Sequence, residues 1–92
     1  MAKIKNSNVS KKILENSSGG KVIRFNILPE KAILTIKFDS STLVGLIKKN
    51  RFLQAITKIG EIRNNTGDIF QFVILGSESE KKIAKVLKDF CA

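Results

Sequence analysis

The sequence predicts an α+β domain of two layers, in which a mostly antiparallel four-stranded sheet carries two helices on one face in the order ββαββα. Three observations lead to this prediction. Alternating apolar residues flank a turn at 28–31, an apolar run at 69–75 follows a turn cluster at 64–68, and a helical pattern follows each of these strand regions. Sheets and helices with one apolar face each bury that face by packing in layers.

The first two strands are expected within residues 21–38. Apolar residues occupy every second position on both sides of a turn: Ile23, Phe25, Ile27, Leu34, Ile36 and Phe38. Pro29 suits this turn because it has no amide hydrogen to donate to a strand ladder. This period-2 pattern on both sides of a turn predicts a β-hairpin with one buried face.

A helix is expected to begin at Leu43, since residues 39–42 offer several N-cap side chains. One straight helix from 42 to 60 would be apolar all round, which does not suit a two-layer domain. The simpler interpretation therefore ends the helix near Asn50 and makes residues 53–63 a strand. A second helix through Gly60 is the alternative.

The C-terminal part repeats the hairpin–helix order. Residues 64–68 predict a turn, and residues 69–75 predict a central strand because they are rich in β-forming apolar side chains. Ser77 and Glu80 then have the spacing of a helix capping box. In the helix that follows, the lone cysteine Cys91 falls on the apolar side and is expected to be a buried structural thiol. The two ββα halves suggest an internal repeat at the level of architecture.

Charge divides the chain into regions. The 92 residues fit one domain, and 17 Lys and Arg against 8 Asp and Glu give a net charge of +9. Residues 1–24 hold six cations and one anion, residues 48–63 hold five cations and one anion, and the remainder is balanced. We expect a basic flexible tail over residues 1–20, with a Ser-Ser-Gly-Gly joint at its end, and a single domain over residues 21–92.

Catalytic and metal-binding equipment is scarce. The sequence has no His, Trp or Tyr, and its one Cys lacks a partner for zinc binding or for nucleophilic catalysis. No phosphate-binding Gly-Lys-Ser/Thr loop is present. We therefore expect no enzyme activity, no cofactor and no metal. The absence of a long apolar run and of a signal-peptide pattern predicts no membrane association and a cytoplasmic location.

The candidate site is the run Lys48-Lys49-Asn50-Arg51-Phe52. Its cations can contact phosphates, and Phe52 can stack on a base, although the usual burial of phenylalanine favours a core position. The other candidate contacts are in the first hairpin, near the second turn and in the tail: Arg24, Arg63, Lys11 and Lys12. An ordinary solvated face and charged tail would show the same charges.

Two functions from different classes follow. The preferred hypothesis is a non-catalytic protein that binds DNA or RNA through phosphates. The alternative is a small structural or regulatory subunit of a larger complex, of the transcription or tRNA-modification type. Strand 69–75 or the outer sheet face would then contact a protein partner or a second copy. A regulator that blocks a nucleic-acid enzyme is a third possibility. These features do not distinguish DNA from RNA.

Overall fold

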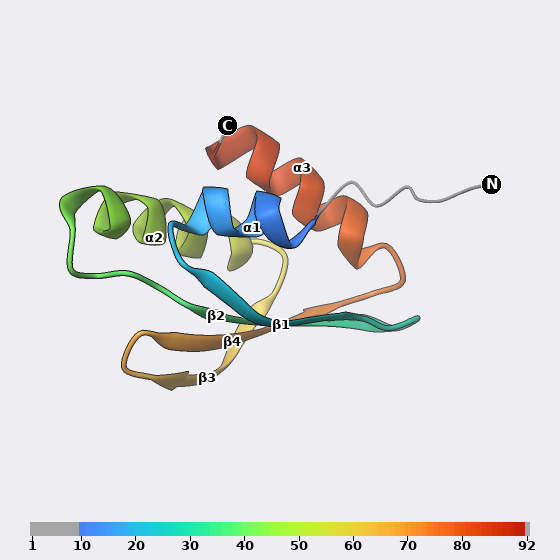
Figure 1. Ribbon diagram of the computed structural model, residues 1–92. Coiled ribbons are helices and arrows are strands. Elements are labelled where there is room, and N and C mark those ends of the chain that lie inside the picture. The colour runs from blue at the N-terminus through green and yellow to red at the C-terminus, as the bar shows by residue number, and fades with distance from the viewer. Residues whose placement is uncertain (1–9, 92) are drawn as a thin grey trace.

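A computed structural model describes residues 10–91, except for the side chains of Phe90 and Cys91. The elements in chain order are α1 (Lys11–Ser18), β1 (Lys21–Ile27), β2 (Lys31–Lys37), α2 (Leu43–Ile56), β3 (Glu61–Thr66), β4 (Ile69–Leu75) and α3 (Ser79–Cys91). The α+β class and the four-stranded antiparallel sheet are confirmed. The helices lie on one side of the sheet and leave its other face open (Figure 1).

The sheet has the order β1-β2-β4-β3, and every neighbouring pair is antiparallel. Two hairpins therefore lie side by side, joined where β2 pairs with β4, and each is followed by a helix. This is the predicted ββα repeat at the level of architecture. Both edge strands contain an irregularity near their N-terminal ends, between Val22 and Arg24 in β1 and between Ile62 and Asn64 in β3.

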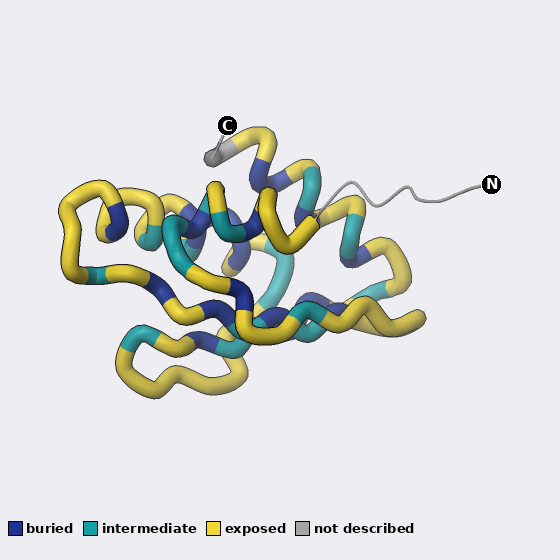
Figure 2. Tube along the Cα trace, in the orientation of Figure 1, coloured by how far each residue is buried: buried dark blue, intermediate teal, exposed yellow. Residues whose placement is uncertain are grey.

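The core lies between the sheet and the helices. Alternate residues of the two central strands point toward the helices and are buried: Ala32, Leu34 and Ile36 of β2, and Phe70, Phe72 and Ile74 of β4. Leu14, Phe52 and Ile83 come from the three helices and complete this cluster. In Figure 2 the buried stretches of the helices and of the central strands face one another.

Helix α1 lies within the segment expected to be a flexible tail. Ser10 caps its N-terminus by accepting a hydrogen bond from the Ile13 amide, and Gly19 ends it in the left-handed region at φ 73°. Leu14 is fully buried, and the Glu15 carboxylate accepts a hydrogen bond from the Val22 amide at 3.0 Å. The folded domain thus includes residues 10–20, and the sheet carries three helices rather than two. Residues 1–9 of the expected tail lie outside the described range.

Helix α2 continues six residues beyond the predicted end at Asn50, and β3 begins at Glu61 rather than at residue 53. The objection to a long helix was that its apolar residues surround it. The apolar residues of α2 do surround the helix. Those in its first two turns remain exposed, whereas Phe52, Ala55 and Ile56 enter the core. The Gly60 amide donates to the Ile56 carbonyl at 2.9 Å just past the helix end. Of the region 52–63, the first part is therefore helix and the last part strand.

Candidate nucleic-acid interface

Phe52 does not contribute an exposed ring. Its side chain is fully buried, with its ring centre 5.9 Å from that of Phe38 and 6.0 Å from that of Phe72. These edge-on contacts are typical of a packed aromatic core. The prediction that Phe52 stacks on a base is therefore wrong, and the alternative prediction, that Phe52 is a core residue, is confirmed.

Lys49 is engaged inside the domain. Its Nζ lies 3.5 Å from Asp68 Oδ1 and 3.4 Å from Ser40 Oγ. The same ammonium lies over the rings of Phe38 and Phe70, at 5.8 and 5.2 Å from their centres. Because a carboxylate and two aromatic faces already stabilise this charge, Lys49 is a poor candidate for a phosphate contact.

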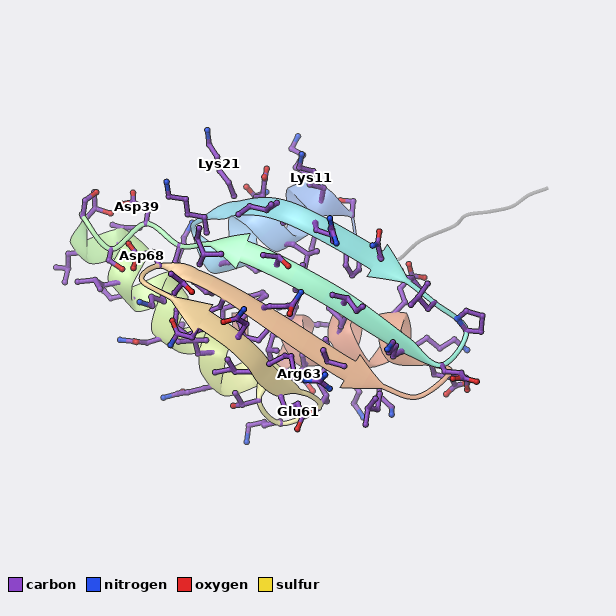
Figure 3. The ribbon with its side chains drawn as sticks, turned by 90° about the horizontal axis from the view of Figure 1, so that it is seen from below. Lys11, Lys21, Asp39, Glu61, Arg63 and Asp68 are labelled. Atoms are coloured by element: carbon purple, nitrogen blue, oxygen red, sulfur yellow. The ribbon has the colours of Figure 1, made fainter. Side chains whose placement is uncertain are left out.

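The six other predicted cations are exposed but do not form one cluster. Lys48 and Arg51 lie on α2, Lys11 and Lys12 on α1, Arg24 on β1 and Arg63 on β3. Arg63 pairs with Glu61 at 3.4 Å. Figure 3 shows this pair at the β3 edge of the sheet, whereas Lys11 and Lys21 lie at the opposite, β1 edge. The structure therefore separates Arg63 from the cations of the N-terminal half.

The first hairpin presents cations that the sequence analysis did not select. Because Ala32, Leu34 and Ile36 face the helices, the alternate positions of β2 face the open side of the sheet. Lys37 is one of these, and Lys21 stands directly opposite it on β1. Arg24 pairs with Thr35 and shares this side. The period-2 pattern of the sequence already places Lys37 and Arg24 on the polar face of the hairpin. A sum of charges along chain segments does not reveal that these two cations share a face.

Close backbone contact places Lys21 beside the end of β2. A Cβ on Gly20 would lie 2.3 Å from the Lys37 carbonyl oxygen, so only glycine permits this approach. Gly20 therefore allows the start of β1 to lie against the end of β2, where the strand register pairs Lys21 with Lys37. Within residues 10–91 neither lysine has a carboxylate at ion-pair distance.

A shallow pocket of about 520 Å³ opens at this end of the hairpin. Its lining joins the start of β1 to the loop after β2 and to the β3–β4 turn: Gly19, Gly20, Lys21, Lys37, Phe38, Asp39, Ser40, Ser41 and Asp68. Both carboxylates have donors of their own. Asp39 accepts from the Ser41 hydroxyl and amide, which lower its pKa, and Asp68 accepts from Ser40 and Lys49. Lys21 and Lys37 also line the pocket, and neither forms an ion pair with these carboxylates.

Other kinds of site find little support in the described part of the chain. Among the side chains that the structure describes, no three or more acidic residues gather in a group that could hold a metal ion. None of the helices described there is long and apolar enough to cross a membrane.

The chain matches no protein-family model, no curated protein and no solved structure. The surface is therefore interpreted from its own residues.

Proposed function

We propose that this chain is a non-catalytic nucleic-acid-binding protein that contacts phosphates through one basic surface. This hairpin surface consists of Lys11 and Lys12 of α1, Lys21 and Arg24 of β1, and Lys37 of β2. The observation that carries the proposal is the position of Lys21 directly opposite Lys37. Like charges directly opposite in neighbouring strands destabilise a sheet. A polyanionic ligand would offset this repulsion, since lysine and arginine are the usual phosphate contacts.

The surrounding residues extend this basic surface around the β1 edge of the sheet toward α1. Helix α1 packs on β1, and Figure 3 shows Lys11 and Lys21 projecting from the same edge of the molecule. Between residues 11 and 37 the chain has six cations and two anions, and one of those anions, Glu15, is bound to the Val22 amide. Lys48 lies beside the C-terminal end of α1, near Gly19, and extends the basic area toward α2.

Among the aromatic side chains that the structure describes, none offers an exposed stacking ring on this surface. Phe38, Phe52, Phe70 and Phe72 are buried, and the half-buried Phe25 pairs with Leu34 on the helix-facing side. Sequence-selective recognition of single strands depends on aromatic stacking and base-edge contacts. The proposed mode is therefore phosphate contact with little sequence preference, and steep salt dependence is its signature.

A salt titration tests this proposal. Binding of the full chain to labelled single- and double-stranded DNA and RNA is followed by fluorescence anisotropy from low to physiological salt. The double variant Lys21→Gln/Lys37→Gln is expected to lose about 1.8 from the slope of log K against log salt on double-stranded DNA and about 1.4 on single strands, because each phosphate contact contributes about 0.9 and about 0.7, respectively. Its melting temperature should equal or exceed that of the native chain, because like-charge repulsion is removed.

The matched control is Lys85→Gln/Lys88→Gln on α3, which removes the same charge from two exposed positions outside the hairpin surface. This variant is expected to keep the native slope. The proposal fails if the native chain does not bind at low salt. It also fails if both double variants lose the same slope, because net charge alone would then explain the binding.

A further inference from the structure

The first two turns of α2 expose four neighbouring aliphatic side chains. Leu43, Val44, Leu46 and Ile47 are 72%, 64%, 39% and 46% exposed, and we call this set the α2 apolar face. Figure 1 shows these turns at one end of the molecule, away from α3. Single exposed apolar residues are ordinary on protein surfaces, but a contiguous group of them marks an interaction site.

The fold does not require these residues to be apolar. The inward side of the same turns is occupied by Gly45, where a Cβ would lie 2.1 Å from the Asp39 carbonyl oxygen. Core contacts of α2 begin farther along, at Phe52, Ala55 and Ile56. Polar residues at the exposed positions would leave this packing unchanged. The α2 apolar face therefore contributes nothing to the core of the isolated domain.

The positive charge beside the α2 apolar face indicates which kind of molecule could bind there. Helix α2 contains no acidic residue, and the exposed cations Lys48 and Arg51 follow the face directly. Neither has an ion-pair partner within residues 10–91. A second copy would bring the same cations together on two chains of net charge +9, which opposes association. A lipid surface is less well matched, because the face lacks the aromatic residues that favour the membrane interface.

The spacing of the face suits a helix as partner. Leu43, Leu46 and Ile47 follow the i, i+3, i+4 pattern by which helices present an apolar stripe to one another. We propose that the α2 apolar face docks an amphipathic helix of a protein partner whose flank carries carboxylates toward Lys48 and Arg51. This proposal does not depend on nucleic-acid binding, because its apolar anchors Leu43 and Ile47 lie outside the hairpin surface and only Lys48 borders both.

A designed probe tests the docking site. The probe is a synthetic helical peptide with leucine at heptad positions a, d and e and glutamate elsewhere, and a matched peptide carries lysine in place of glutamate. Isotope-labelled full-length protein is titrated with each and followed by NMR. The acidic peptide is expected to bind saturably, with shift changes centred on residues 43–51, and the lysine peptide is expected not to bind.

Two variants and two controls define the contacts. Leu43→Ser/Ile47→Ser should weaken binding about tenfold or more, as loss of buried anchors does, and Arg51→Glu should weaken it severalfold. The control Leu75→Ser, at a site 61% exposed on the sheet, and the control Lys88→Glu on α3 should bind as the native chain does. Thermal melting confirms that each variant folds.

Four outcomes overturn the proposal. They are absence of saturable binding, shift changes centred elsewhere, equal binding of both peptides, and native affinity in the Leu43→Ser/Ile47→Ser variant. Two parallel measurements identify a different occupant. If sedimentation with phosphatidylserine vesicles depends on Leu43 and Ile47 while the acidic peptide does not bind, the face is a lipid contact. If self-association in analytical ultracentrifugation depends on these residues instead, it is an interface between copies.

Discussion

Lys49 Nζ lies 3.5 Å from Asp68 Oδ1, and through this contact helix α2 is joined to the turn between β3 and β4. The lysine is about one-fifth exposed, and its charge also lies over two phenylalanine rings. Lys48, its neighbour in the sequence, is exposed and has no such partners among the residues that the structure describes. Adjacent lysines of the same basic run therefore have different roles.

This difference predicts unequal effects of neutralising the two lysines. Lys49→Gln should lower the free energy of unfolding by about 1 kcal/mol, because a partly buried ion pair and two cation–π contacts are lost. Lys48→Gln should leave it within about 0.5 kcal/mol of the native value. Urea unfolding of both variants measures the difference. Equal stabilities would show that Lys49 contributes no more than a surface charge.

Leu14 predicts that α1 is part of the folded unit. Leu14→Ala should cost about 2–4 kcal/mol, because a fully buried leucine leaves a cavity. Ile13→Ala, at a neighbouring site that is 41% exposed, should cost less than about 1 kcal/mol. Thermal melting of both variants provides the test. If Leu14→Ala melts as the native chain does, α1 is not packed on the domain in solution.

Gly45 predicts a reversal of the usual preference for alanine in helices. Gly→Ala inside a helix normally gains up to about 1 kcal/mol. At this position the added Cβ would lie 2.1 Å from the Asp39 carbonyl oxygen, so we expect a net loss of about 1–3 kcal/mol from overpacking. Leu43→Ala in the same turn, at a 72% exposed position, is the control and should stay within about 0.5 kcal/mol. A more stable Gly45→Ala variant would contradict this close contact.

Asp39 predicts a contribution to acid sensitivity. The Ser41 hydroxyl, and then its amide, donate to the Asp39 carboxylate and hold its pKa below the usual 3.8. The stabilisation is therefore complete above the unfolded-state pKa and is lost as the pH falls through the lower folded-state pKa. Asp39→Asn should reduce the loss of unfolding free energy below about pH 4.

An NMR titration of the Asp39 carboxylate tests this directly. Ser41→Ala should move the midpoint upward toward the usual value, because both the hydroxyl donor and the local turn are weakened. An unchanged midpoint would show that these hydrogen bonds do not hold the carboxylate in solution.

Local patterns were sufficient for most of the sheet. Alternation located β1 and β2 within residues 21–38, and the run 69–75 coincides with β4, because strand periodicity reflects a sheet with one covered face. In β1 the predicted burial of Ile23 is wrong, because the irregularity between Val22 and Arg24 buries Val22 and leaves Ile23 57% exposed. The limits of α1 and α2 depended on tertiary packing instead. Leu14 anchors a helix of eight residues that would not be stable alone. The end of α2 was predicted too early because its apolar residues were assumed to face the core, whereas those of its first two turns are exposed.

The cations of the candidate site were predictable only in part, because the sum of charges along a segment does not show where each side chain points. Lys48 and Lys49 are adjacent in sequence, yet packing directs one to solvent and the other to Asp68. Lys21 and Lys37 are sixteen positions apart, yet strand pairing places them directly opposite one another. Only the register of the hairpin reveals that second relationship.

The irregularities in β1 and β3 have a consequence for how the protein behaves at high concentration. An edge strand with a regular row of free amide and carbonyl groups is a template for intermolecular strand addition and fibril growth. Bulges at Val22–Arg24 and Ile62–Asn64 interrupt that row at both outer edges of the sheet. We therefore expect that samples concentrated for NMR resist cross-β aggregation.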